Sequence, residues 1–251
     1  MRGGANFPVR LQFAKHGKIR WISHRDTARA FERAFRIEAL PLTFTEGFSP
    51  RPKVSFGLAL STGYESDEEF LDVSFREPVE LDELPARLNV ALPSGIEVTG
   101  AVELDERAPA LQEVVTAVTW MVDVGRDHEV ALDAEELRSG VAALLARDEV
   151  IVTRSRKGRL VDDDVRAAIR SCTVVGAAGD GTVRCELETS TQPRGAKPHD
   201  VLAAVMQVTP AIGPLTERCV VRTHQWIERD GARVSPLDAD TRRRAEAARA
   251  S

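Results

Sequence analysis

Two short segments near the start of the chain carry the side chains best suited to binding an anion. They are KHGKIRWISHRD at 15–26 and EGFSPRPK at 46–53. Guanidinium, ammonium and hydroxyl groups all donate hydrogen bonds to phosphate or carboxylate oxygens. The two segments therefore predict a substrate-binding or phosphate-binding set made of Lys18, Arg20, Ser23, Arg25, Ser49, Arg51 and Lys53.

The second segment is built to hold Arg51 stiffly. Gly47 permits a tight turn, while Pro50 and Pro52 restrict the backbone on either side of the guanidinium. A fixed guanidinium favours bidentate contact with phosphate or carboxylate. The alternative is a structural loop in which Arg51 pairs with an acid such as Glu46.

Two histidines of the first segment are the candidates for catalysis. His16 lies in a His-Gly turn and His24 at a helix start, and imidazole acts as a general acid or base near neutral pH. The alternative for His24 is a local hydrogen bond at the helix start. We expect no metal and no other cofactor, because the chain lacks His and Cys residues at ligand spacing and any Gly-rich phosphate motif.

A helix must position the first segment. Ser23 precedes Asp26 by three residues, which is a capping-box pattern, and the helix is expected at 24–39. Its apolar face repeats at three- and four-residue intervals in Ala28, Phe31, Ala34, Phe35 and Ala39. Its arginines lie off that face, where they form either a solvated side or part of a binding surface: Arg25, Arg29, Arg33 and Arg36.

The loop at 45–52 decides whether the two segments meet. Eight extended residues span up to about 26 Å, whereas a 16-residue helix is about 24 Å long. Convergence of the two segments is therefore permitted but not required. A further basic turn, RSRKGR, places Lys157 and Gly158 at a hairpin tip, which is either a second phosphate-contacting edge or a solvated turn.

Charge is distributed unevenly along the 251 residues. Residues 1–57 hold 11 Lys and Arg against 4 Asp and Glu, residues 58–150 hold 6 against 22, and residues 151–251 hold 17 against 13. A net charge of −5 argues against indiscriminate binding of nucleic acid, yet a local basic surface still binds phosphate. With no signal-like or membrane-spanning apolar run, we expect a cytoplasmic protein without membrane association.

Alternating apolar residues and helix signals predict an α+β fold. The first unit has the order β-α-β-β-α-β of a ferredoxin-like domain. Its elements are expected at 7–14, 24–39, 54–60, 69–76, 81–91 and 96–104. The second unit repeats the order with strands or helices at 114–125, 133–147, 149–155, 183–190, 198–207 and 217–228. Between 155 and 183 we expect a polar insertion with a short helix and an added strand near 171–176.

These elements predict two tandem ferredoxin-like units packed together. The first unit, with the basic loops, is expected at 1–107, the second at 108–229, and a mobile polar tail at 230–251. The three cysteines, Cys172, Cys185 and Cys219, are expected to be small core residues.

The motifs HGKIRWISHRD, ALPLTFTEGFSPRPKVSFGLALSTGYES and RKGRLVDDDVRAAI resemble the radical-SAM-linked protein family, a domain of unknown function. In that family the domain often follows a radical-SAM, B12-binding-type domain in one chain. The resemblance extends to about Glu228 and implies a radical-SAM protein as a partner. This chain has no CxxxCxxC motif, so it does not itself hold the radical-SAM cluster.

Two functions from different classes follow. The first is an RNA-associated binding or accessory module that presents tRNA or rRNA to a radical-SAM partner for modification. The second is an RNA-processing or RNA-modifying enzyme that uses His24 or His16 as acid or base. A protein-interaction subunit without a nucleic-acid role is the third alternative. Trp21, Phe44 and Phe48 are the aromatic residues available to stack on single-stranded RNA.

Overall fold

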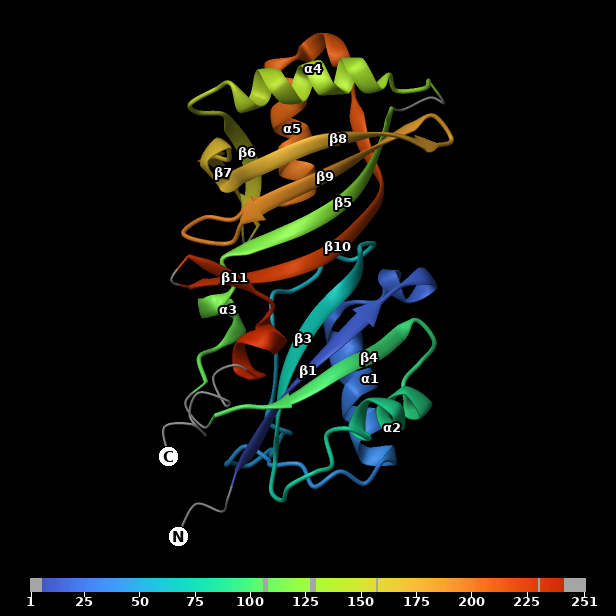
Figure 1. Cartoon of the computed structure of the whole chain (residues 1–251), viewed down its shortest axis with the longest axis vertical. Coiled ribbons are helices and arrows are strands. Elements are labelled where there is room, and N and C mark those ends of the chain that lie inside the picture. Colours follow the sequence, from blue (N-terminus) through green and yellow to red (C-terminus); the bar gives the residue numbers. More distant parts are fainter. Residues whose placement is uncertain (1–5, 106–107, 127–129, 157, 230, 242–251) are drawn as a thin grey trace. The chain divides into compact units, whose positions relative to one another are not determined.

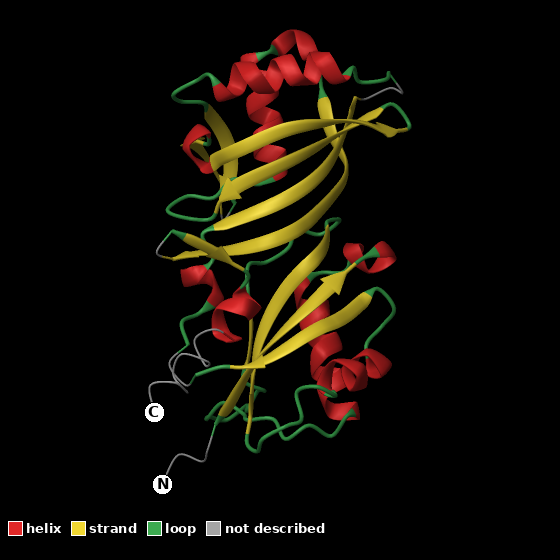
Figure 2. Cartoon of the chain, in the orientation of Figure 1, coloured by secondary structure: helices red, strands yellow, loops and turns green. Residues whose placement is uncertain are grey.

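A computed structural model describes residues 6–105, 108–126, 130–156, 158–229 and 231–241. The chain forms two compact units. Unit 1 contains Met1–Val115 and Gln225–Ser251, and unit 2 contains Thr116–His224. Figure 1 labels most of the helices and strands, and Figure 2 colours helices red and strands yellow.

Unit 1 is a ferredoxin-like unit. Its elements are β1 (Phe7–Lys15), the 3-10 helix η1 (Gly17–Trp21), α1 (His24–Ile37), β2 (Val54–Phe56), β3 (Glu65–Phe75), α2 (Leu84–Ala91), β4 (Ile96–Glu103) and α3 (Leu111–Val114). The strand order is β4-β1-β3, with β2 paired to β3, and these pairs are antiparallel. This is the arrangement expected for a βαββαβ unit.

The core of unit 1 lies between this sheet and the helices α1 and α2. Leu11 pairs in register with Leu71, and both are fully buried. Phe31 and Phe35 from α1 and Leu88 from α2 belong to the same cluster. Apolar residues alternate along the strands and recur every three to four residues along α1. Each element therefore has one apolar face, and these faces pack against each other in the core.

The chain returns to unit 1 near its end. The last residues of β10 (Leu215–Arg229), from Gln225 onward, belong to unit 1, and β11 (Ala232–Val234) pairs with them. A helical turn follows at 236–241. Of the expected polar tail, residues 231–241 are therefore part of unit 1, whereas residues 230 and 242–251 lie outside the described residues.

Unit 2 repeats the topology. Its elements are β5 (Ala117–Arg126), α4 (Ala134–Leu145), β6 (Ile151–Arg156), β7 (Arg159–Asp164), the 3-10 helix η2 (Arg166–Ala168), β8 (Ile169–Gly179), β9 (Thr182–Ser190), α5 (Pro198–Val208), the 3-10 helix η3 (Pro210–Ile212) and the first part of β10. The strand order is β10-β5-β9-β8. The predicted α+β class with two ferredoxin-like units is confirmed.

One strand assignment in unit 2 was wrong. We expected 149–155 to form a strand of the main sheet and 171–176 to form an added strand. Instead, the strand that contains 171–176 belongs to the main sheet, and the strand near 149–155 lies outside it. β8 pairs with β9 in the sheet, whereas β6 pairs with β7 in a separate two-stranded hairpin. Both segments are short and contain several β-branched residues, so the sequence pattern alone does not distinguish a sheet strand from a hairpin strand.

Candidate functional site

The turn at 15–21 is held in place by Glu65 at the start of β3. The carboxylate accepts a hydrogen bond from Gly17 N at 3.0 Å and another from Arg20 Nη1 at 2.9 Å. Burial tends to raise the pKa of Glu65, but hydrogen bonds from Gly17, Arg20 and His16 outweigh it and leave this pKa below its ordinary value. The ring of His16 lies between Glu65 and Asp67, with Nε2 at 3.1 Å from Asp67 Oδ1.

Trp21, at the end of this turn, is 64% exposed. One part of its ring lies over Gly63, where an added Cβ would come within 3.0 Å of the indole, and Gly63 has a φ of +91°. Gly63 N also donates to Arg20 O at 2.8 Å. The Arg20 guanidinium carbon lies 5.4 Å from the centre of the indole ring. Two predicted features of the segment, a cation and an aromatic ring, are therefore fixed side by side.

The predicted helix start is confirmed. Ser23 is the N-cap of α1, and its hydroxyl accepts from Asp26 N at 3.2 Å and donates to Asp26 Oδ2 at 2.7 Å. The hydrogen bond from Ser23 is the main reason that the pKa of Asp26 is lowered. The helix ends at Ile37, and Ala39, the last residue expected in it, takes a positive φ of 49°. Ser23 is therefore engaged in capping the helix. Arg25, in the first turn of α1, is exposed.

A buried polar cluster next to α1 was missed by the sequence analysis. Lys15 is 4% exposed, and Glu69 is 7% exposed. They line a small hollow with His24 and several apolar side chains. Lys15 Nζ donates to Ile22 O at 3.3 Å. Burial lowers the pKa of Lys15, and the charge of Glu69 partly offsets this effect.

The sequence did carry a signal for this cluster. Lys15 continues the inward series of the core residues Leu11 and Phe13, two positions apart along β1. Glu69 stands in the same relation to Leu71 on β3 and is the register partner of Phe13. Charged side chains at inward positions of a strand must be paired or functional, because burial of an isolated charge is costly.

His24 borders the hollow from the start of α1. Its ring lies edge-on to Phe56, with 5.0 Å between the ring centres. Burial lowers the pKa of His24, and the positive charge of Lys15 lowers it further. The hollow has about 20 Å³ of room for a water-sized sphere, which is roughly one water molecule.

The second predicted segment forms a small hairpin. Phe44 and Pro52 form an antiparallel bridge, Thr45 N donates to Arg51 O at 2.8 Å, and Lys53 N donates to Thr43 O at 2.8 Å. Arg51 N donates to Thr45 Oγ1 at 3.0 Å. We call residues 43–53 the loop hairpin. At its tip Gly47 has a φ of +126°, as its turning role requires.

The loop hairpin presents its side chains to solvent. Phe44 is 47% exposed and the side chain of Phe48 is fully exposed. Ser49, Arg51 and Lys53 are also exposed. Within the described part of the chain, Arg51 forms no ion pair, so the expected alternative of a pair with Glu46 is not observed.

The structure does not bring the two segments together. Glu65 at the start of β3 holds the turn at 15–21, whereas Ser74, near the end of β3, exchanges hydrogen bonds with Thr43 and Lys53 of the loop hairpin. Nine residues of extended strand separate these anchors by about 30 Å. The turn at 15–21 and the start of α1 thus lie at one end of unit 1, and the loop hairpin lies at the other (Figure 1). The first group contains Lys18, Arg20, Ser23 and Arg25, and the second contains Ser49, Arg51 and Lys53.

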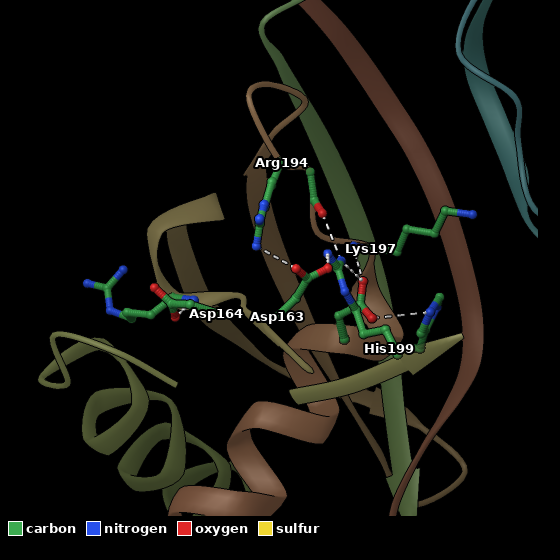
Figure 3. A network of polar contacts seen from close by, with 9 residues as sticks. Asp163, Asp164, Arg194, Lys197 and His199 are labelled. Carbon is green, nitrogen blue, oxygen red and sulfur yellow. Dashed lines mark hydrogen bonds and ion pairs between the residues drawn. The ribbon is translucent and has the colours of Figure 1, made fainter. Parts of the chain in front are cut away.

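The remaining predicted site residue, Lys157, lies outside the described residues. The strands β6 and β7 form a hairpin that is held against the rest of unit 2 by a network of ion pairs (Figure 3). Arg154 donates to Asp163 Oδ2 at 2.6 Å and to Asp200 Oδ2 at 3.1 Å, and Arg194 donates to Asp163 Oδ1 at 2.6 Å. Burial tends to lower the pKa of Arg154, but these carboxylates outweigh it and raise the pKa.

This network explains the acidic run of the motif RKGRLVDDDVRAAI. Asp163 is 1% exposed and binds two arginines, while Asp164 Oδ1 accepts from Val150 N and Arg166 N at 2.9 Å each. Asp162 accepts from Thr153 Oγ1 at 2.7 Å on the exposed side. These carboxylates position the hairpin. Throughout the described ranges, no group of three His, Cys, Asp or Glu side chains is placed to hold a metal ion.

Comparison with known proteins identifies a family without an assigned activity. A family model described as an uncharacterized protein conserved in bacteria (DUF2344) matches residues 9–198. No curated protein matches the chain.

Two solved structures show a distant likeness. A chain in a Cbf5-Nop10-Gar1 complex has a TM-score of 0.47 and 10% identity, and covers 86% of this chain. A chain in the archaeal box H/ACA sRNP Nop10-Cbf5 complex has a TM-score of 0.43 and 9% identity, also covering 86% of this chain. This chain spans about half the length of each, 48% and 47%. Likeness at this level says nothing of activity, because one fold serves many functions.

Proposed function

The chain belongs to the DUF2344 family of uncharacterized bacterial proteins, and we propose that this member is an RNA-binding module. Its binding surface lies within residues 1–57, which we call the basic N-terminal part of unit 1. The ligand class follows from the side chains exposed there, since flat aromatic rings stack on bases and cations bind phosphates.

One observation carries the proposal. In the described part of the chain, the exposed aromatic side chains are Trp21, Phe44 and Phe48, and all three fall within the basic N-terminal part. The other described aromatic residues are buried or half-buried. Leaving a fully exposed ring such as Phe48 in water forgoes roughly 1.5–3 kcal/mol of burial free energy, and the partly exposed Trp21 and Phe44 forgo less, so a binding role accounts for the exposed rings.

Cations accompany these rings. Several exposed Lys and Arg side chains of unit 1 form no ion pair among the described residues, and they are Lys18, Arg25, Arg33, Arg36, Arg51, Lys53 and Arg76. Arg29, in contrast, is paired with Asp26 at 3.1 Å. Cations without internal partners are available to neutralise phosphates, and the release of counterions then drives binding.

We prefer this binding role to the alternative of an RNA-processing enzyme. His24 borders a hollow with room for about one water molecule, which is too small for a nucleotide. His16 is engaged by Glu65 and Asp67. Neither histidine therefore has a substrate-sized pocket beside it among the hollows described.

We also propose a radical-SAM protein as the partner that would act on the bound RNA. This part rests on the sequence resemblance alone, because neither the family model nor the similar structures mention such a protein. Co-purification of a tagged full-length chain from a bacterium that contains it, followed by mass spectrometry, tests the partner separately from RNA binding.

A titration of the full-length protein with labelled total tRNA and rRNA fragments tests the main proposal. We expect binding that weakens steeply between 50 and 200 mM salt, because each phosphate contact adds to the salt dependence. A protein that binds neither RNA at 50 mM salt, while its circular dichroism shows a folded chain, would contradict the proposal. An acidic polymer without bases, such as heparin, measures the purely electrostatic part.

A further inference from the structure

We infer that the loop hairpin is a site for an unpaired RNA strand, with bases stacked on Phe48 and Phe44 and phosphates held by Arg51 and Lys53. This inference rests on the proposed function and names its ligand more closely. It concerns only residues 43–53, at one end of unit 1.

The hairpin is preorganised by its own hydrogen bonds. Thr45 and Arg51 are joined through Thr45 N to Arg51 O at 2.8 Å and through Arg51 N to Thr45 Oγ1 at 3.0 Å. Its base is tied to β3, because Thr43 N donates to Ser74 O and Ser74 N donates to Lys53 O. A loop held at its base loses less conformational freedom on binding, which favours affinity.

Within the described part of the chain, neither ring of the loop hairpin packs against another aromatic ring. Phe48 is fully exposed, and Phe44 is 47% exposed on the strand side of the same hairpin. By comparison, Phe56 in the adjacent β2 packs edge-on against Phe13 and Phe31. Phe48 therefore presents a ring that contributes little to the stability of unit 1 and is available for a ligand.

The charges near these rings favour a nucleic acid over an apolar partner. Arg51 and Lys53 are exposed and unpaired among the described residues, and Glu46 is the one carboxylate of the hairpin. The hairpin thus has a charge balance of +1 beside two aromatic rings. Single-stranded nucleic acids are bound by this combination of base stacking and cationic contact with the backbone.

The exposed rings also favour single-stranded RNA over duplex RNA. In a duplex the bases are already stacked on one another, so they cannot lie against Phe48 without unpairing. Unpaired loops and ends carry bases that can turn outward and stack on a protein side chain. We therefore expect the loop hairpin to distinguish an unpaired strand from a duplex.

Fluorescence anisotropy with the full-length protein tests this inference. The probes are a fluorescein-labelled unstructured RNA 12-mer, an RNA duplex of 12 base pairs, and a 12-mer that keeps the ribose-phosphate backbone but lacks bases. We expect Phe48→Ala to weaken binding of the unstructured 12-mer about 5- to 150-fold, the range for loss of one stacked base. The duplex and the abasic strand should bind this variant and the unchanged protein alike.

Matched variants distinguish the loss of base stacking from a general loss of folding or of surface apolar area. Phe48→Trp keeps a flat ring and should restore affinity for the unstructured 12-mer. Val90→Ala removes another exposed apolar side chain of unit 1, 86% exposed on α2, and should change nothing. Circular dichroism and thermal melting confirm that each variant is folded.

The outcomes distinguish this inference from the proposed function. If the unchanged protein binds RNA but Phe48→Ala binds the unstructured 12-mer equally well, the loop hairpin is not the stacking site and RNA binding itself still stands. Equal loss for the unstructured and the abasic strand would also overturn stacking. If the unchanged protein binds tRNA or rRNA fragments but not the unstructured 12-mer, this inference fails and the proposed function stands; if it binds none of these RNAs, the proposed function fails.

Discussion

The Arg10 guanidinium and the Asp240 carboxylate form a buried ion pair, with 2.6 Å between Nη1 and Oδ2 and side chains that are 2% and 3% exposed. Arg10 also contacts both oxygens of Asp72 across the β1–β3 pair, at 2.7 and 2.9 Å. The first strand of unit 1 is thus joined to the segment that follows β11, although 230 residues separate them.

Asp240→Asn should lower the free energy of unfolding of unit 1 by about 3 kcal/mol, the lower end of the range for breaking a buried pair, because Asp72 still compensates Arg10. Hydrogen exchange at the amides of β1 and β11 reports on unit 1 separately from unit 2. The exposed neighbour Asp238 offers a matched control, and Asp238→Asn should change stability by less than about 0.5 kcal/mol. Equal protection in the two variants would show that the ion pair does not secure this segment.

Asp163→Asn should loosen the β6–β7 hairpin. Arg154 and Arg194 would lose a buried anionic partner. The cost should not exceed about 3 kcal/mol, the lower end of the range for breaking a buried pair, because Arg154 keeps Asp200 and the side chain of Arg194 is 60% exposed. A two-stranded hairpin has little stability of its own, so the cost should appear as faster hydrogen exchange in β6. Asp162→Asn is the control, because Asp162 is exposed and its side-chain hydrogen bond among the described residues is to Thr153 in the same hairpin. Unchanged exchange in Asp163→Asn would contradict the role given to the network.

The lowered pKa of His24 predicts a pH dependence of stability. Because the imidazole has its ordinary pKa near 6.5 in the unfolded chain and a lower one in the folded chain, the unfolded state binds more protons below that pH. Stability should therefore fall as the pH drops below about 6.5, and less so in His24→Asn. Urea denaturation at pH 8, 7, 6 and 5 measures this difference.

The effect of Lys15 on the pKa of His24 can be tested directly. Lys15→Met removes a cation that lowers the pKa of His24, so NMR titration of the His24 ring should show that this pKa rises. Lys18→Met, an exposed cation of the same segment, is the control. A His24 pKa equal in all three proteins would mean that Lys15 does not act on the ring.

Arg51→Ala should weaken RNA binding by about 1–3 kcal/mol while the fold stays intact, because a charge-assisted hydrogen bond is lost without a buried partner being stranded. The salt dependence should also become shallower, since one phosphate contact fewer releases fewer counterions. Titrations at 50 and 200 mM salt measure both effects. Arg147→Ala removes an exposed, unpaired arginine of the described part of unit 2, and unchanged binding is expected there. Equal affinities in the two variants would remove Arg51 from the RNA site.

Sequence patterns predicted those parts of the site that form within a few residues of each other. The Ser23 cap of α1 is confirmed, because capping joins groups only three positions apart. The positive φ of Gly47 likewise fits the tight turn expected in its segment. Exposure of Trp21, Phe44 and Phe48 could not be read from the chain, because an aromatic residue between polar ones can either fold inward or remain in water.

The sequence by itself determined the α+β class, the repeated βαββαβ order and the concentration of cations in the first 57 residues, because strand alternation, helix spacing and charge are local properties. Only the tertiary structure decided that β8 rather than β6 enters the sheet, that Lys15 and Glu69 share a hollow, and that the turn at 15–21 and the loop hairpin lie at opposite ends of β3. Each of these depends on strand register and on which faces pack together. Both are set by contacts between residues far apart in the chain, which no local pattern records.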